Sequence, residues 1–281
     1  MAEIVSVIAV AHAPGATGWL DKAPKHEQEA LLSGYARMAE ALRAAKPDVI
    51  VGIANDHLLN FPMDSVPDWC VGTAERWSGP AEWFREWVNV PDYELAGQRD
   101  LGRHIVRDSA RRGLNLAFSD QLLFDDNWSV PLKFLTPAYD VPLVPIHMNC
   151  VMPPVPSPRR CFEFGRSLAE TVRAWPQDAR VAIMATGGLS HDPGGLKYFE
   201  VDEAFDRWFL QMLAGGDPEQ VLREVTVEKM MAAGDGGTIE LLAWLVAMGA
   251  AGTRPAQTMF YVPSVPLRCG MGGVDWNVAA A

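Results

Sequence analysis

The sequence has little basic charge. Among its 281 residues, Lys and Arg number 24 and Asp and Glu number 35, so the formal net charge is −11 with neutral His. A nucleic-acid-binding protein needs a basic face to neutralise phosphates, and an anionic membrane surface attracts clusters of basic residues. The charge balance therefore argues against nucleic acid and against membrane as partners. The hydrophobic share of 49% and the charged share of 21% are typical of a globular domain rather than a disordered acidic tail.

Cysteines and long apolar runs are also scarce. The chain has four cysteines without CxxC spacing, at positions Cys70, Cys150, Cys161 and Cys269. Disulfide frameworks are typical of short secreted chains, and zinc sites of paired cysteines need closer ligands, so we expect reduced, mostly buried thiols. The apolar run at 4–11 lacks a basic leader, and no stretch reaches the roughly 18–20 apolar residues that span a bilayer. These features predict a cytoplasmic protein.

Strand-like and helix-like segments alternate along the chain. Short β-branched runs predict strands at 4–10, 48–54, 114–118, 141–148, 180–186 and 258–262. Helical spacing of apolar residues predicts helices at 26–45, 94–112, 159–174, 200–213, 217–232 and 238–250. This alternation indicates an α/β fold, with a single domain over residues 1–281 and a central mixed, partly parallel sheet flanked by helices. A tryptophan-rich stretch at 59–93 interrupts the alternation.

Three of the six histidines directly follow predicted strands: His12, His57 and His191. A single histidine there is best interpreted as a cap of the strand end. Three in the same position favour a shared site, because parallel strands bring their carboxyl ends together at one edge of a sheet. The remaining three are expected elsewhere, on solvated helix surfaces for His26 and His104 and in the core for His147. No GxGxxG or GxxxxGK[ST] motif follows a strand, so nucleotide binding is unsupported.

A carboxylate would complete a metal site with these histidines. Neutral imidazole is the commonest transition-metal ligand, and two His with one carboxylate form the facial triad of non-heme Fe(II) oxygenases. The candidate carboxylates are Asp56, Asp125, Asp126, Asp192 and Glu240. Glu240 stands out because it opens an otherwise apolar helix. The helix dipole alone favours an acid there, but a buried carboxylate also needs a partner, and a metal is one.

Four segments carry a family resemblance. They read Ala-His-Ala-Pro-Gly at 11–15, Ala-Asn-Asp-His-Leu-Leu-Asn-Phe at 54–61, Gly-Gly-Leu-Ser-His-Asp-Pro at 187–193 and Gly-Gly-Thr-Ile-Glu-Leu-Leu-Ala-Trp-Leu at 236–245. In this order they resemble the class III extradiol ring-cleavage dioxygenases, the superfamily of the protocatechuate 4,5-dioxygenase catalytic β subunit. The resemblance spans about residues 4–266 and implies a single catalytic domain.

The resemblance implies roles for the matching residues. His12, His57 and Glu240 would be the ligands of Fe²⁺, and His191 would be the acid/base that takes a proton from the substrate and later returns it. The substrates would be dioxygen and a small aromatic compound of catechol type, including gallate-like or aminophenol-like compounds, whose ring is split beside its two metal-chelating groups.

One departure concerns a second active-site histidine, which many members carry in the segment that here reads 125–132. This chain is expected to place Asn127 there, and an amide cannot shuttle a proton. Asn127, Asn149 and Asn60 are the predicted substrate-binding residues, although Asn149 also suits a turn cap. Asn55 and Asn60 flank His57 and are expected to orient it.

Several alternatives stay open from the sequence. A metal-dependent hydrolase would use the same ligand types, and a non-catalytic partner subunit would explain Asn127. The resemblance implies pairing with a small helical subunit or an equivalent extra domain, and we expect a homo-oligomer or such a pairing. The tryptophan-rich stretch suits a lid, an interface or core. A carboxylated substrate would need a basic residue. Lys197 follows His191 closely, and Arg268 would serve only if the C-terminal segment folds over the site.

Overall fold

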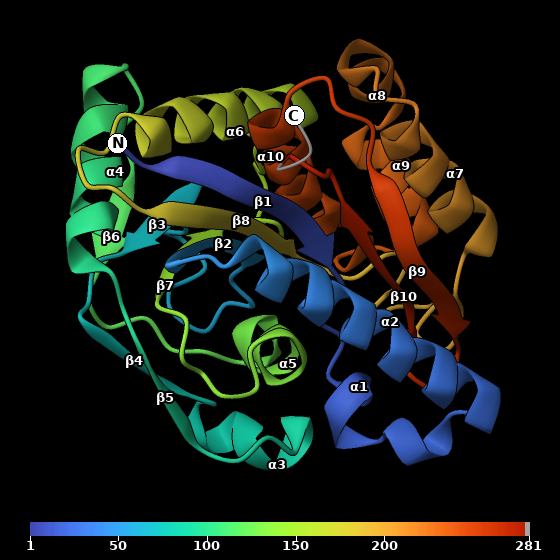
Figure 1. Ribbon diagram of the computed structural model, residues 1–281. Coiled ribbons are helices and arrows are strands. Elements are labelled where there is room, and N and C mark those ends of the chain that lie inside the picture. The colour runs from blue at the N-terminus through green and yellow to red at the C-terminus, as the bar shows by residue number, and fades with distance from the viewer. Residues whose placement is uncertain (279–281) are drawn as a thin grey trace.

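An eight-stranded sheet forms the centre of the computed structural model, which describes residues 1–278 (Figure 1). The strand order is β6-β3-β7-β2-β8-β1-β10-β9. The bounds are β1 Glu3–Val10, β2 Val49–Asn55, β3 Trp69–Gly72, β6 Ala117–Ser119, β7 Leu143–Met148, β8 Arg180–Thr186, β9 Gln257–Ser264 and β10 Cys269–Asp275. A second sheet pairs β4 (Arg76–Gly79) with β5 (Tyr93–Ala96).

The middle of the large sheet is parallel. Strand β8 pairs in parallel with β1 on one side and β2 on the other, and β2 pairs in parallel with β7. Antiparallel pairs flank this centre, with β10 beside β1, β9 beside β10, and β3 beside β7. The predicted mixed α/β sheet is confirmed. Its consequence is that β1, β8 and β2 end at the same edge, where ligands of open α/β sheets bind.

Helices cover both faces of the sheet (Figure 1). The longer ones are α2 Lys25–Ala45, α4 Arg99–Arg111, α5 Asp126–Leu135, α6 Pro158–Arg173, α7 Glu203–Ala214, α8 Pro218–Glu224, α9 Val227–Ala233 and α10 Leu241–Ala251. The short segments are α1 Gly15–Gly18, α3 Arg85–Val88, η1 Leu20–Lys22, η2 Glu82–Phe84 and η3 Thr238–Glu240. Helices α6 and α10 pack on one face, and α2 and α5 pack on the other.

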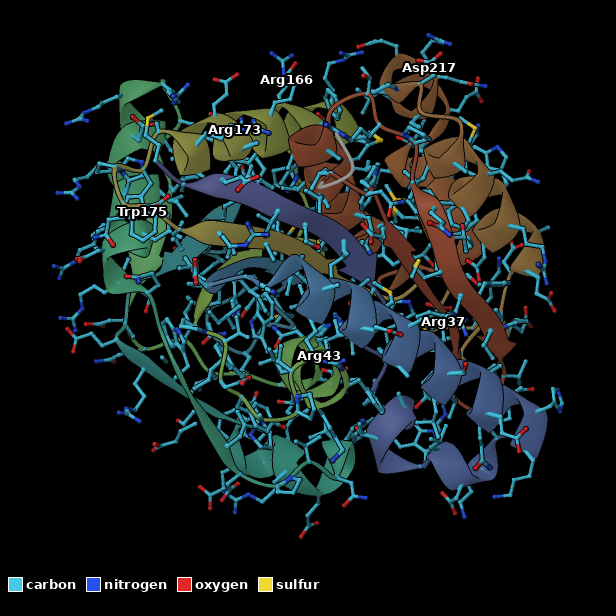
Figure 2. All side chains as sticks on the ribbon, in the orientation of Figure 1. Arg37, Arg43, Arg166, Arg173, Trp175 and Asp217 are labelled. Atoms are coloured by element: carbon cyan, nitrogen blue, oxygen red, sulfur yellow. The ribbon has the colours of Figure 1, made fainter. Side chains whose placement is uncertain are left out.

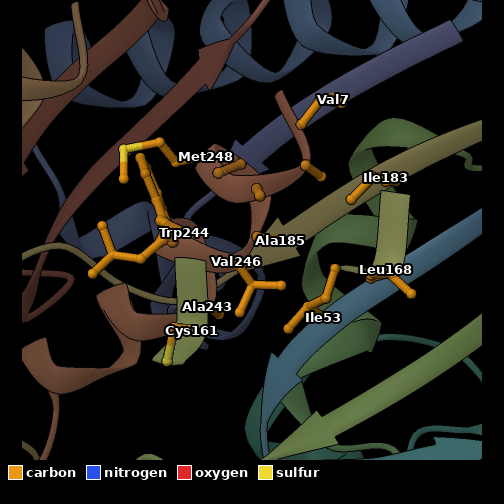
Figure 3. Packing of buried hydrophobic residues seen from close by; sticks show 14 of the residues in the cluster. Val7, Ile53, Cys161, Leu168, Ile183, Ala185, Ala243, Trp244, Val246 and Met248 are labelled. Atoms are coloured by element: carbon orange, nitrogen blue, oxygen red, sulfur yellow. The ribbon is translucent and has the colours of Figure 1, made fainter. Parts of the chain in front are cut away.

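Alternating strand side chains supply two cores. Val7 and Ile183 belong to the cluster beneath α10, whereas Ile8 and Met184 belong to the cluster beneath α2. Figure 3 shows Val7, Ile183 and Val246 of α10 in the first cluster. All residues of α10 are buried, so this helix is apolar on every side and lies inside the molecule. Each buried side chain of this size stabilises the fold by roughly 1.5–3 kcal/mol.

Charged side chains point outward from the covering helices. Figure 2 labels Arg37 and Arg43 on α2 and Arg166 and Arg173 on α6, and all four are exposed. These helices therefore present charged side chains to solvent on their outer faces. Within residues 1–278, the helices all lack the combination of length and apolarity that crossing a bilayer requires.

Several predicted elements differ from the structure. The predicted helix at 217–232 is wrong, because the chain leaves the helix at Val225 and Thr226 caps a new one, α9. The predicted helix at 94–112 begins only at Arg99, since Tyr93–Ala96 forms β5. Strand β10 escaped prediction because it holds three glycines, which are rare in strands. The stretch at 59–93 contains β3 and β4 and so belongs partly to the folded core.

Candidate active site

Three strand ends bring three histidines to one carboxylate. His12 follows β1, His57 follows β2 and His191 follows β8, while Glu240 closes η3 directly before α10. The Nε2 atom of His57 lies 2.8 Å from Glu240 Oε1, and Nε2 of His12 lies 3.2 Å from Glu240 Oε2. His191 Nε2 lies 3.6 Å from the same Oε2. The sheet topology therefore assembles the group that the sequence pattern predicted.

Hydrogen bonds fix the orientation of each imidazole. His57 Nδ1 lies 3.0 Å from Asp125 Oδ2, a carboxylate that only accepts, so Nδ1 carries the hydrogen. His191 Nδ1 donates to the Leu189 carbonyl at 2.7 Å for the same reason. His12 Nδ1 contacts Thr186 Oγ1 at 3.0 Å, and that hydroxyl donates onward to the Asn127 carbonyl at 3.2 Å. By the same rule His57 Nε2 donates to Glu240 Oε1 while the ring is protonated. When the rings are neutral, the Nε2 lone pairs of all three histidines face Glu240.

Glu240 itself is held as an ionised acceptor. Its side chain is 2% exposed. Asn55 Nδ2 donates to Oε1 at 3.2 Å, and the Gly188 N–H donates to Oε2 at 2.9 Å. Burial opposes ionisation, but the positive charge available on His12 and His191 outweighs it and holds the pKa of Glu240 well below its usual value. An ionised carboxylate facing three Nε2 lone pairs requires a cation or protons between them.

Two further acids face this cluster from the start of α5. Asp125 caps the helix by accepting from the Asn127 N–H, and Asp126 Oδ1 lies 3.5 Å from His57 Nδ1. Burial lowers the pKa of His57, yet the charges of Asp125 and Asp126 raise it well above its ordinary value. Burial also raises the pKa of Asp126 to about 6. The excess of carboxylates gives the cluster a negative field that attracts a cation.

The donor set fits a divalent transition metal. Imidazole nitrogens and a carboxylate are the ligands of the facial triad, and each imidazole already has a hydrogen-bond partner that orients it. Ligand atoms of His12, His57 and Asp126 lie within 4.8 Å of one another, so Asp126 is a second candidate carboxylate. Glu240 is the stronger candidate because its two oxygens contact the Nε2 atoms of both His12 and His57.

The cluster lines a cavity of about 730 Å³. Its walls are mostly apolar and aromatic, and they include Ala13, Pro14, Trp19, Leu58, Phe84, Trp87, Val151, Tyr198 and Leu267. A pocket of this size with a few convergent polar groups is typical of a site for a small organic molecule. The histidines and acids stand at its polar end and provide metal-binding and proton-transfer groups next to an apolar chamber.

Residues 6–265 match the family described as the catalytic LigB subunit of aromatic ring-opening dioxygenase. The chain belongs to this family. LigB-family dioxygenases are metal-dependent, in agreement with a site whose His and Asp groups can hold a metal ion. The recognised resemblance to the extradiol dioxygenase superfamily is thus confirmed.

Two curated dioxygenases are similar to this chain at moderate identity. A gallate dioxygenase from Pseudomonas putida is 28% identical over 61% of this chain and 51% of its own length. A 2,3-dihydroxyphenylpropionate/2,3-dihydroxicinnamic acid 1,2-dioxygenase from Photorhabdus laumondii is 26% identical over 75% of this chain and 65% of its own length. The chain thus spans about half to two-thirds of these relatives. An uncharacterized protein from Escherichia coli K12 shares the fold, with a TM-score of 0.55 at 16% identity, over 87% of this chain and 91% of that chain.

The three asparagines predicted to bind substrate lie outside the cavity lining of this LigB-family chain. Asn127 donates to the Asn55 carbonyl at 3.0 Å, and Asn149 Nδ2 donates to the Met152 carbonyl at 2.6 Å, as a turn cap does. Asn60 bonds Asp56 and so does not orient His57. Their predicted role in substrate binding has no cavity contact to support it.

Asp126, rather than Asn127, is the residue of α5 that lines the cavity. Asn55 was expected to orient His57, but its amide bonds Glu240 instead. The sequence analysis does not predict that Thr186 orients His12 or that Asp125 orients His57. For Thr186 the sequence does contain one signal for such a role: it is the last residue of strand β8, which leads to His191. For Asp125 the sequence contains no comparable signal.

The remaining sequence predictions have mixed outcomes. His147 is a buried core histidine, as expected, and accepts from Trp128 Nε1 at 2.8 Å. The solvated interpretation of His104 is wrong, because its half-buried ring donates to the Thr171 carbonyl at 2.9 Å. All four cysteines are free and buried, as expected. Lys197 bonds the Ala232 carbonyl outside the cavity lining, whereas Arg268 lines the cavity.

Proposed function

We propose that this chain is a non-heme Fe²⁺-dependent extradiol dioxygenase that cleaves the ring of a small catechol-type substrate with dioxygen. The observation that carries the proposal is the contact of the His12 and His57 Nε2 atoms with the two oxygens of buried Glu240, in a cavity of a LigB-family chain. His12, His57 and Glu240 would hold the iron. When bound, the iron supplies a Lewis acid with open positions for the two substrate oxygens and dioxygen.

His191 would transfer the protons in this reaction. Its Nδ1–H is committed to the Leu189 carbonyl at 2.7 Å, so the neutral ring keeps its Nε2 lone pair on the cavity side. Burial lowers the pKa of His191, but the Glu240 charge outweighs this and raises it above the ordinary value. A base of this kind accepts a proton from a substrate hydroxyl and, as imidazolium, returns it to a developing oxyanion.

The cavity walls supply an apolar surface for the substrate ring and keep water out. Trp19, Phe84 and Trp87 present apolar surface that holds an aromatic ring and excludes water. A dry chamber strengthens the interaction between the substrate and the charged groups at its polar end.

Oxygen uptake tests the proposed reaction. Protein purified under nitrogen and supplied with Fe²⁺ is mixed with catechol, protocatechuate, gallate and an aminophenol in an oxygen electrode. We expect at least one of these to consume dioxygen in equal amount to the ring lost, with no product under nitrogen. Turnover of an ester or amide under nitrogen would instead support a metal-dependent hydrolase. Stoichiometric iron without oxygen uptake on any substrate would support the non-catalytic partner subunit.

We also propose a cytoplasmic location and an oligomeric assembly. Four free, buried thiols suit a reducing compartment. The side chains of Trp83 and Phe199 are 64% and 65% exposed, and large exposed aromatics are enriched in interfaces. A mass measurement in solution distinguishes a homo-oligomer from a monomer that pairs with a small helical subunit.

A further inference from the structure

The cavity contains one cation that the proposed chemistry does not use. Arg268 is the one Arg or Lys among the described residues that line it, and it lies in the turn between β9 and β10. We propose that Arg268 binds a carboxylate carried by the aromatic substrate and so selects acid-bearing diols over neutral ones. This inference rests on the proposed function, because it assigns the substrate class of the same cavity.

The backbone at Arg268 shows that the turn does not require this side chain. Its φ is 62°, in the left-handed region, and its N–H donates to the Val265 carbonyl at 3.0 Å to close the turn. Glycine or asparagine adopts this conformation at lower cost than arginine. An arginine in an unfavourable backbone conformation at a cavity wall indicates that its side chain has a function there.

Three aromatic rings hold the guanidinium in place. Its Cζ atom lies 4.4 Å from the ring centre of Tyr198 and 5.3 Å from those of Trp19 and Phe199. Trp19 is itself fixed to the turn, because its Nε1 donates to the Pro266 carbonyl at 3.0 Å. Cation–π contacts of this kind remove water from the faces of the guanidinium and leave its N–H edge to bind.

The guanidinium of Arg268 has N–H groups without a hydrogen-bond acceptor, and no carboxylate pairs with it within residues 1–278. Nη1 donates to the Tyr198 hydroxyl, and this is the one hydrogen bond of the guanidinium within residues 1–278. Surface arginines in the same part of the chain, such as Arg159 and Arg180, pair with glutamates, whereas Arg268 has no such ion pair there. A planar fork with free donors recognises a carboxylate through two parallel charge-assisted hydrogen bonds.

The charge distribution then orients the substrate. Asp126 and Glu240 line the cavity beside the histidines, where the proposed iron would bind the diol oxygens, whereas Arg268 offers a separate positive charge. The acid group of a substrate would therefore bind at Arg268 and leave the diol for the histidine end. A volume of about 730 Å³ accommodates a ring with a carboxylate or a short acidic side chain.

Anaerobic binding tests this inference apart from the reaction. The iron-loaded protein is titrated calorimetrically under nitrogen with 3,4-dihydroxybenzoate, 3-(2,3-dihydroxyphenyl)propionate and the neutral amide of each. We expect at least one acid to bind about tenfold or more tightly than its amide. In Arg268→Gln this preference should fall to within about twofold, and in Arg268→Lys, which keeps the charge but loses the fork, it should be intermediate. The exposed Arg43→Gln on α2 is the control and should keep the full preference (Figure 2).

The outcomes separate the two proposals. A preference for the acid that persists in Arg268→Gln, or equal binding of acid and amide by the unaltered protein, overturns the assignment of Arg268. Oxygen uptake on neutral diols would still support ring cleavage in that case. An Arg268-dependent preference without oxygen uptake on any diol would instead support the carboxylate site and contradict the proposed function.

Discussion

Gly188→Ala is expected to move the histidine that transfers protons. A Cβ at Gly188 would lie 2.6 Å from His191 Cε1 and 2.7 Å from both His191 Nδ1 and Cys269 Sγ. The first of these distances is about 0.8 Å shorter than the 3.4 Å at which ordinary van der Waals contact begins. Cys269 is fully buried and is held in strand β10 by its pairing with β9, so the imidazole is the group that must give way. Its bond to the Leu189 carbonyl would be stretched or lost.

The size of the effect follows from this displacement. Misplacing a reacting group by about 1 Å costs on the order of 10²-fold in rate, so we expect kcat to fall about 10²-fold. Overpacking also costs about 1–3 kcal/mol of unfolding free energy. Iron content should stay unchanged, because the Gly188 N–H that bonds Glu240 is retained.

Three measurements check this prediction: oxygen uptake, metal analysis and urea unfolding. The matched control is Gly215→Ala at the end of α7, where the nearest atom to a new Cβ lies 3.4 Å away. We expect that variant to keep its kcat. A Gly188→Ala protein with unaltered kcat would refute the acid/base role of His191, and a parallel loss of iron would show that the substitution acts on the metal site instead.

Two further predictions concern buried groups behind the site. Asn55→Ala removes the amide that bonds Glu240 and also leaves the buried Cys150 N–H without its acceptor. We expect a 10- to 100-fold weaker iron affinity in a chelator competition and a loss of about 1–3 kcal/mol in urea unfolding; unchanged affinity would exclude a role in orienting Glu240. Burial raises the pKa of Asp206 to about 6, so this carboxyl favours folding below about pH 4, and the contribution is lost as the pH rises through 6. The unfolding free energy of the unaltered protein relative to Asp206→Asn should therefore fall by about 2 kcal/mol between pH 4 and pH 7, and a constant difference would contradict the raised pKa.

The sequence predicts the histidine cluster well because it needs only local information. His12, His57 and His191 each follow a short β-branched run, and the parallel arrangement of such runs brings their ends together. Glu240 is found in the same way, because a carboxylate at the start of a wholly apolar helix requires a partner.

Other parts of the site depend on packing that no local pattern reveals. Asp126 and Asn127 are neighbours on the first turn of α5, and successive helical residues point about 100° apart. Only the placement of α5 against β2 and β8 decides that Asp126 lines the cavity while Asn127 bonds the Asn55 carbonyl. Arg268 reaches the cavity because the glycine-rich strand β10 pairs with β1, a contact between the two ends of the chain.

Metal content of two carboxylate variants tests the central claim most directly. Iron per chain is measured by mass spectrometry in the unaltered protein, Glu240→Gln and Asp126→Asn, all loaded with Fe²⁺ under nitrogen and confirmed as folded by circular dichroism. If Glu240 completes the site with His12 and His57, Glu240→Gln loses its iron while Asp126→Asn keeps a near-stoichiometric amount. Stoichiometric iron in Glu240→Gln, with loss in Asp126→Asn, would contradict the account and assign the third ligand to Asp126.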